Sequence, residues 1–552
     1  MATKNDTIEL ATKRIGTRVY SIRWYRLIHA LRCLVAGDVA PLLQAQIAAT
    51  DSGRSGQQRV TGMDSPHEDD RQFSELYDIF VTALQEGRSN DLLKATKTLM
   101  MQVAFSVPDI DVEDGEKIES LAIQAYLSKR LGQKPVGCDA GMHMRKSFVD
   151  YMCGGIGWSQ VALDESGRPV IQYLDALDVI HDLSTDMPQD LHWYAHVCRK
   201  PGYRWVQMYG EKAFATELKK GDWLERPVTL TYYYDIDGET GNYAVFKGEF
   251  PSESDLVDSG PNPFYTIIDN VRKPFLNADP CVFMVLPSVR YPVGILQNMV
   301  PHQMAIWASE RYMRDVLERG APFHEVQKGA LDAKSLAAFK DGTLGSIIEV
   351  QVQNGITTHE AMDVPQSVSI YSQYNRDEIQ SASGVDPFAT GDADQNFNFA
   401  SEVNAVASRA DLTAHHMTKD HCNHWQRTLK KYLATAALYD DAPVELNIDG
   451  TRMQFDEKMP INMFLRPDAE ILVSEDSTRY MSQAERFQRA TAVLNVVAPF
   501  ASQFPNGPSK ALEGVLRAAG IKDIAGWLKP PDSPMMGADM GTASADAGAS
   551  MQ

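Results

Sequence analysis

The sequence predicts an α+β protein, and three features of the chain carry this prediction. Residues 400–439 contain no glycine or proline, which is typical of one long helix. Two shorter helical segments precede it, at 300–319 and at about 369–383, and an insert of mixed character separates them. Residues 158–247 contain runs of β-branched and aromatic side chains between turn residues, which is typical of antiparallel strands.

The composition indicates a folded, acidic protein. Of the 552 residues, 44% are hydrophobic and 23% are charged, which is ordinary for a globular chain that buries a sizeable core. Lysine and arginine number 53, against 73 aspartates and glutamates, so the formal net charge is −20. Proteins that grip nucleic acid usually carry a basic patch, so this balance argues against tight phosphate binding.

The chain is expected to have neither a membrane span nor a disulfide framework. No apolar run approaches the roughly 18 residues that a transmembrane helix needs. The first residues lack the apolar core of a signal peptide. The six cysteines are scattered without a C-x-x-C pair, which favours reduced, mostly buried thiols.

The N-terminal half is expected to mix helices with hairpins. Apolar periodicity predicts helices at 18–35, 73–86, 90–104, 114–131 and 140–153. Strand signals occur at 158–163, 169–174, 228–235 and 243–247. Polar and turn-forming residues dominate 50–70 and 251–263, so the first is predicted to be a mobile linker and the second a loop.

The central stretch opens with a helix that is predicted to span 300–319. Pro301 fits its first turn, because the missing N–H of proline would be unpaired there anyway. This helix stops at Gly320. The insert that follows contains a short helix near 333–340 and a strand-like run at 346–352.

The second helix of this stretch ends at Gly384, and glycine, proline, aspartate and asparagine make 385–399 a loop. A continuous helix over 400–439 would be about 60 Å long. A closing hairpin, two helices and a disordered tail are expected at 444–455, 477–500, 510–519 and 530–552, respectively.

This order of elements resembles the core of tailed-bacteriophage portal proteins. A helix, a small insert, a second helix, an exposed loop and a very long helix follow one another as the stem, clip, tunnel loop and spine do in that family. Local passages that are similar to family sequences lie at 170–182, 287–294, 383–391 and 398–403. None of them is a catalytic fingerprint, so the order of elements is the stronger signal.

The resemblance implies a portal-like subunit divided along the chain. Its parts are an N-terminal wing of mixed structure (1–293), a first stem helix (294–320), a small α/β clip (321–368), a second stem helix (369–384), a tunnel loop (385–399), a long spine helix (400–439), closing wing strands (440–476), a helical crown (477–529) and a disordered tail (530–552).

The resemblance places the tunnel loop around translocating DNA. Its tip carries amides, acids and two aromatic rings without lysine or arginine, namely Asp392, Asp394, Gln395, Asn396, Phe397, Asn398 and Phe399. Amides contact phosphates without fixing them and carboxylates weaken the hold, which suits a conduit. The alternative is that Phe397 and Phe399 pack back onto neighbouring helices.

The stem helices are expected to form the interface between ring subunits. The residues assigned to this interface are Trp307, Arg311, Tyr312, Arg314, Tyr371 and Tyr374. In the clip, Lys328, Lys334 and Lys340 would form a positive belt for DNA phosphates or for docking proteins. The alternative for these charges is an ordinary solvated helix surface.

Motifs of catalysis are missing from the sequence. Neither G-x-S-x-G nor a Walker lysine occurs, and the glycines at 154–157 lack the spacing of a phosphate loop. We therefore expect no catalytic residue, no cofactor and no enzyme activity. The rival hypothesis is a metal-dependent hydrolase, although a catalytic metal usually needs three protein ligands. It would use His415, His416, His421 and His424 on the long helix, with Asp411 and Asp420 nearby.

The sequence as a whole predicts a phage portal protein. The resemblance implies a homo-oligomeric ring, twelvefold in that family, at one capsid vertex of a virion that is made in the host cytoplasm. Its partners would be double-stranded DNA that passes without sequence specificity, the terminase motor, head–tail adaptor and tail proteins, and the major capsid and scaffolding proteins, but no membrane. Another ring-forming head–tail connector protein is the alternative.

Overall fold

The computed structural model describes most of the chain between residues 87 and 473. The described residues are 4–16, 28, 30–32, 34–35, 82–83, 87–104, 107–112, 118–132, 137–164, 166–182, 190–219, 222–249, 252–268, 271–283, 292–319, 323–341, 350, 352, 354–359, 364–383, 400–448, 451–456, 459–473, 491 and 495. The chain forms two compact units, residues 1–448 with 452–479 and residues 449–451 with 480–552. The helices and strands below lie in the first unit, apart from one residue of the strand β15.

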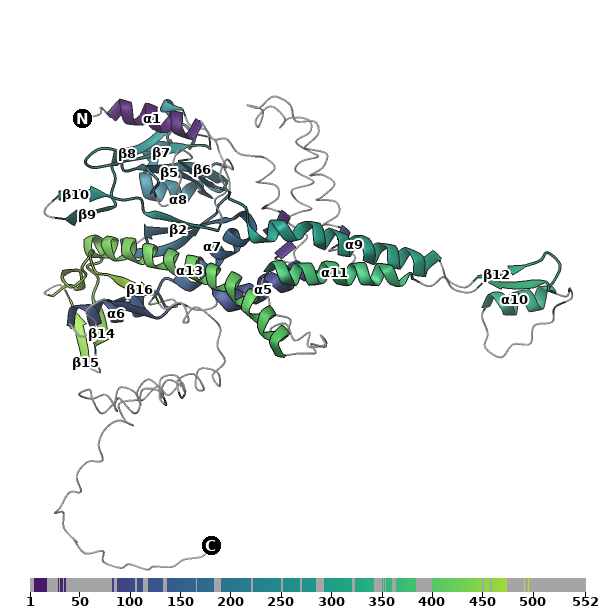
Figure 1. Ribbon diagram of the computed structural model, residues 1–552. Coiled ribbons are helices and arrows are strands. Elements are labelled where there is room, and N and C mark those ends of the chain that lie inside the picture. Colours follow the sequence, from purple (N-terminus) through teal and green to yellow (C-terminus); the bar gives the residue numbers. More distant parts are fainter. Residues whose placement is uncertain are drawn as a thin grey trace, which may run out of the picture. The chain divides into compact units, whose positions relative to one another are not determined.

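The described residues combine helices and sheets, which confirms the predicted α+β class (Figure 1). The α-helices are Lys4–Gly16 (α1), Asp91–Val103 (α5), Ile118–Arg130 (α6), Ala140–Gly154 (α7), Gly202–Tyr209 (α8), Ile295–Arg319 (α9), Ala333–Asp341 (α10), Gln366–Ser383 (α11) and Ala400–Tyr439 (α13). Short 3-10 helices span Glu211–Phe214 (η2), Glu253–Asp255 (η3) and Ile461–Met463 (η4). Among these residues, no helix combines the length and the apolarity that crossing a bilayer requires.

The strands form several small sheets. They are Ile110–Val112 (β1), Ile156–Leu163 (β2), Pro169–Leu174 (β3), Val179–His181 (β4), Trp193–Pro201 (β5), Pro227–Asp235 (β6), Asn242–Lys247 (β7), Leu256–Pro261 (β8), Tyr265–Ile268 (β9), Val271–Pro274 (β10), Ala278–Val282 (β11), Phe323–Val326 (β12), Ile356–His359 (β13), Val444–Ile448 (β14), Thr451–Phe455 (β15) and Ile471–Val473 (β16). The larger sheets have the orders β4-β5-β6-β7-β8 and β11-β2-β3, and the pairs are β1-β16, β9-β10, β12-β13 and β14-β15.

Two features of the five-stranded sheet differ from the sequence prediction. The prediction of a loop at 251–263 is wrong, because Leu256–Pro261 pairs with β7 as an edge strand. An edge strand that stays partly exposed needs few apolar residues, and it tolerates glycine and proline. The strand β5 is missing from the prediction, since most of it is buried on both faces and its residues do not alternate.

The C-terminal part of α13 lies in the main core, against β2, β3, β11 and β16. Its buried positions recur at helical spacing, and they include Met417, His421, Trp425, Leu429 and Tyr432. Polar groups on the same face also reach the sheet, although His421 Nδ1 has no partner among the described residues. The carboxylate of Asp279 on β11, for example, accepts hydrogen bonds from Arg427 and Lys431 on the helix. This helix is therefore stabilised from within its own chain.

The helices α9 and α11 run side by side (Figure 1). The start of α9 and the end of α11 share one core cluster, through Ile295, Met299 and Ile379, so the two helices are antiparallel. The prediction that α9 begins at Val300, with Pro301 in its first turn, is wrong. The helix begins at Ile295, because its first turn is buried in the core, and Pro301 lies inside it. Just before that turn, a Cβ on Gly294 would collide with the backbone of α7, so this entry requires glycine.

The insert between α9 and α11 contains the predicted short helix, α10, and an antiparallel pair, β12 and β13. These two strands are absent from the prediction, because four residues are too few to display an alternating pattern. Of the run predicted as a strand at 346–352, the structure describes Val350, which forms a bridge with Leu331, and Val352. The predictions for 50–70, 385–399 and 500–552 lie outside the described residues, as do nearly all of 477–499.

Candidate assembly site on the α9–α11 helix pair

The inward face of α11 is made of small and polar side chains. Its fully buried residues are Ser372, Asn375, Ile379 and Ser383, of which only one is apolar. In the seam, His302 Nδ1 on α9 lies 3.0 Å from Asn375 Oδ1, and Asn375 Nδ2 also donates to the carbonyl of Tyr371 within α11. The hydroxyl of Ser372 is buried without a hydrogen-bond partner among the described residues. This seam is therefore close and polar rather than apolar.

The outward face of α11 has the opposite character. Ile370, Tyr371 and Tyr374 are 61%, 53% and 55% exposed, respectively. Their spacing places them on the side of the helix away from the seam. Surface helices normally bury their apolar face and expose their polar one, so α11 is inverted. On α9, Tyr312 and Leu317 are exposed as well.

The tryptophan of α9 belongs to the core rather than to this surface. The side chain of Trp307 is 1% exposed, and its Nε1–H donates to the carbonyl of Ser89 at 2.7 Å. A subunit interface needs atoms that a neighbour can reach, so the expected role of Trp307 in ring contacts is corrected to a role inside the chain. Arg311 and Arg314 are exposed on the same helix and remain candidates for such contacts.

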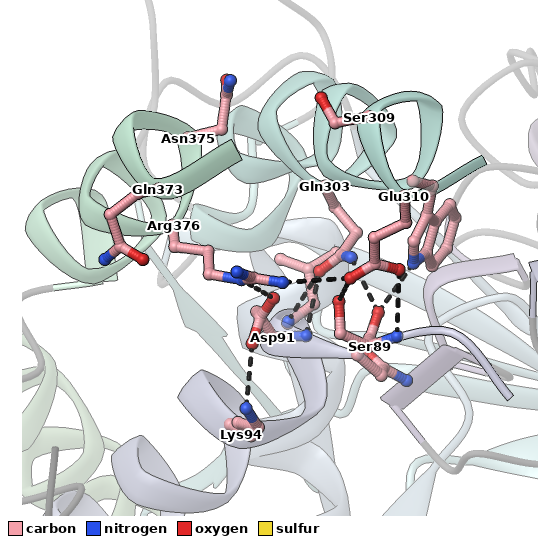
Figure 2. A network of polar contacts seen from close by, with 12 residues as sticks. Ser89, Asp91, Lys94, Gln303, Ser309, Glu310, Gln373, Asn375 and Arg376 are labelled. Carbon is pink, nitrogen blue, oxygen red and sulfur yellow. Dashed lines mark hydrogen bonds and ion pairs between the residues drawn. The ribbon is translucent and has the colours of Figure 1, made fainter. Parts of the chain in front are cut away.

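A network of hydrogen bonds joins the middle of α9, between Gln303 and Glu310, to the start of α5 (Figure 2). Gln303 Oε1 accepts from the backbone amides of Asp91 and Leu92 at 3.0 and 3.1 Å, so it caps two of the free N–H groups at this helix end. Its Nε2 donates to the carbonyl of Ser89. The hydroxyl of Ser89 in turn donates to Glu310 Oε1 at 2.5 Å. Both polar atoms of the buried Gln303 amide are thereby paired.

The helix α11 joins this network through one charged side chain. Arg376 extends from α11 towards two carboxylates (Figure 2), with 3.4 Å from its Nε to Asp91 Oδ2 and 3.0 Å from its Nη2 to Glu310 Oε1. Asp91 also pairs with Lys94. No pattern in the sequence predicts this network. Local spacing gives no sign of contacts between residues 66 to 285 positions apart, and only Asn90, which caps α5, lies in a recognisable helix-start pattern.

The three lysines assigned to the clip, Lys328, Lys334 and Lys340, are all exposed. Their surface positions are compatible with a docking belt and with ordinary solvation. The residues of the tunnel loop, Asp392 to Phe399, lie outside the described residues, so their role stays a prediction.

The histidines of α13 divide into two pairs. His415 and His416 are exposed, whereas His421 and His424 are buried. His421 Nε2 accepts from the indole N–H of Trp425, and His424 Nε2 lies 2.8 Å from Ser159 Oγ. Burial lowers the pKa of His421 to about 3 and that of His424 to about 4, so both are neutral.

His424 Nε2 lies 3.9 Å from Asp279 Oδ2, but the other histidines do not join this pair. Asp420 accepts from the hydroxyl of Tyr151, and the side chain of Asp411 lies outside the described part. Within the described ranges, no three metal-ligating side chains form a group.

Comparisons with known proteins give structural likeness only. No protein-family model matches this sequence, and no curated protein matches it. Among solved structures, the chain is similar to one in "Virion of native gene transfer agent (GTA) particle", with 13% identity, a TM-score of 0.35 and coverage of 62% of this chain and 76% of that one. It is also similar to a chain in "Neck of native GTA particle computed with C12 symmetry", with 12% identity, a TM-score of 0.34 and coverage of 64% and 80%. Matches at this level do not assign a family.

Proposed function

We propose that this chain is a structural virion subunit of the portal type, which assembles into a ring through the α9–α11 pair. The observation that carries this proposal is the inversion of α11, which buries Ser372 and Asn375 and exposes Ile370, Tyr371 and Tyr374. Such an outward face gains stability when a second surface covers it, at about 25 cal/mol per Å² of apolar area removed from water. We infer that the covering surface is a second copy of the chain.

A ring requires a heterologous interface, in which one face of each copy binds a different face of the next. The exposed residues of α9, including Tyr312 and Leu317, supply apolar groups on the second helix of the pair. In the proposed ring, neighbouring α9–α11 pairs pack into a tube. This arrangement would cover the apolar side chains that α9 and α11 both expose.

The proposed ring is a passive conduit for double-stranded DNA. A net charge of −20 disfavours tight binding to a polyanion, and weak contact lets the DNA slide. The tunnel loop at 385–399 would lie nearest the DNA, and the insert at 321–368 would bind the terminase motor and later the adaptor or tail proteins. The ring would occupy one capsid vertex and contact capsid and scaffolding proteins. None of these roles requires catalysis by this chain.

The experiment that tests the assembly surface compares two triple variants. Ile370→Ser, Tyr371→Ser and Tyr374→Ser together should convert rings into single subunits in sedimentation and in negative-stain images. The matched control replaces three similarly exposed apolar residues around α8, through Tyr203→Ser, Met208→Ser and Leu224→Ser. This control should leave rings intact. Equal loss of rings in both variants, or a wild-type chain that stays monomeric at every concentration, would contradict the proposal.

A further inference from the structure

The seam between α9 and α11 does little to fix how far the two helices are displaced along each other. Large side chains that interlock specify one register, whereas small ones leave shallow grooves. The inward face of α11 repeats small or polar residues at Ser372, Asn375 and Ser383, and Ile379 is its one apolar member. The hydroxyl of Ser372 is buried and lacks a partner among the described residues, so the observed register does not satisfy the seam fully.

The position of α9 along its own axis, in contrast, is fixed relative to α5 by hydrogen bonds that are mostly between neutral groups. Gln303 binds two amides of α5 and the carbonyl of Ser89, and Trp307 binds that same carbonyl. Both side chains are buried, so water does not compete for these bonds. Because α9 is held in place, only the position of α11 along α9 is left for other contacts to define.

One side chain of α11 meets a rigid reference outside the seam. Arg376 binds Asp91 at the first turn of α5 and Glu310 on α9 (Figure 2). Both carboxylates are themselves held, Asp91 by Lys94 and Glu310 by the hydroxyl of Ser89. A planar guanidinium that reaches two fixed carboxylates at once satisfies them in one position only. A displacement of α11 by one turn, about 5.4 Å, would break both contacts.

We propose that Arg376 is the positioning residue that sets the register of α11 along α9. Its two ion pairs define the position of α11 along α9, and the small, polar side chains of the seam permit that position. As a consequence, Ile370, Tyr371 and Tyr374 are presented at one level on the outward face. That a neighbouring copy binds these three side chains rests on the proposed function. The register of α11 along α9 is a property of the single chain.

The test measures the register directly in the full-length chain. Nitroxide side chains placed at Ala308 on α9 and Ser381 on α11, both exposed, report the distance between the helices by pulsed electron resonance. Dilution with unlabelled chain removes any signal between copies. The wild-type chain should give one narrow distance. Arg376→Gln should broaden the distribution or shift it by about 5 Å, the rise of one helical turn.

Three further variants separate this role from a general loss of charge or of packing. Arg376→Lys keeps a charge that reaches one carboxylate at a time, and it should broaden the distribution less than Arg376→Gln. Lys94→Gln removes the other partner of Asp91, and Asn375→Ala removes the seam contact with His302. Both should leave the distance unchanged. The proposal is overturned if Arg376→Gln keeps the narrow wild-type distance, or if Lys94→Gln or Asn375→Ala shifts it as much.

The two proposals fail in different measurements. A wrong proposal for Arg376 appears as an unchanged distance in spin-diluted chains, whatever their assembly state. A wrong proposal for the ring appears in sedimentation, whatever the distance between α9 and α11. If both hold, Arg376→Gln should also reduce the fraction of chains in rings at a fixed concentration, while Lys94→Gln should not.

Discussion

The C-terminal part of α13 and the α9–α11 pair distribute apolar and polar side chains in opposite ways. On α13 the inward side chains include large apolar ones, such as Trp425 and Tyr432, and the inward hydroxyls of Thr428 and Thr435 have partners. On α11 the inward side chains are small and polar, one hydroxyl lacks a partner among the described residues, and the large apolar groups face outward. Both segments are regular helices, so helix formation alone does not distinguish them.

The two helices obtain their stability from different sources. The inward face of α13 between residues 417 and 436 is buried within one chain, so its contribution does not depend on concentration. The outward face of α11 gains from burial only when another molecule covers it, so that contribution rises with concentration. An exposed apolar helix face marks a surface that another molecule can cover, which the proposed ring would provide.

The largest expected effect compares one aromatic residue from each region. Trp425→Ala should lower the free energy of unfolding of the unassembled chain by about 3–5 kcal/mol, because it leaves a cavity under α13. Tyr374→Ala should change it by no more than about 0.5 kcal/mol, since this ring is exposed. Denaturant titration at a concentration where the chain is monomeric measures both values. A large loss of stability for Tyr374→Ala in the monomer would break the comparison.

The second prediction concerns how the buried histidines of α13 make the free energy of unfolding depend on pH. His421 and His424 are buried and neutral in the folded chain, with pKa values lowered to about 3 and about 4, whereas unfolding returns them to about 6.5. The unfolded state therefore binds more protons than the folded state between these limits. Stability should fall as the pH drops below about 6.5, by about 1–2 kcal/mol per histidine at pH 5.

The matched measurement compares the wild type with a variant that lacks one buried histidine. His421→Gln should make the dependence of unfolding free energy on pH shallower between pH 6.5 and 4. Comparing variants is necessary because Asp150 acts in the opposite direction. Burial raises its pKa to about 6, so its protonation favours the folded state as the pH falls. Identical slopes for wild type and His421→Gln would refute this account of α13.

Much of the fold could be predicted from local signals. The ends of α13 follow from forty residues without a helix breaker, and α5 follows from apolar residues at helical spacing. Elements without such signals were missed. The strand β5 lacks alternation because most of it is buried on both faces, and the start of α9 is set by burial of Ile295 rather than by Pro301.

The candidate site was harder to predict than the fold. Sequence periodicity marks an apolar residue on a helix but does not tell whether its own chain or a neighbour covers it. Trp307 and Tyr374 were therefore grouped together, although the first is buried in the core and the second is exposed. The contacts of Arg376 join three helices through tertiary packing, and no spacing in the sequence encodes them.

The smallest expected effect compares one hydroxyl from each region. Thr428 on α13 is buried and lies 2.9 Å from Ser159 Oγ, so Thr428→Val should cost about 1 kcal/mol through the lost hydrogen bond. The hydroxyl of Ser372 in the seam is buried without a partner among the described residues, so Ser372→Ala should be neutral or stabilise the monomer slightly. Thermal unfolding of both variants and the wild type, under conditions without assembly, measures the difference. If Ser372→Ala costs as much as Thr428→Val, the seam is as fully satisfied as the core, and the register of α11 needs no contact from outside it.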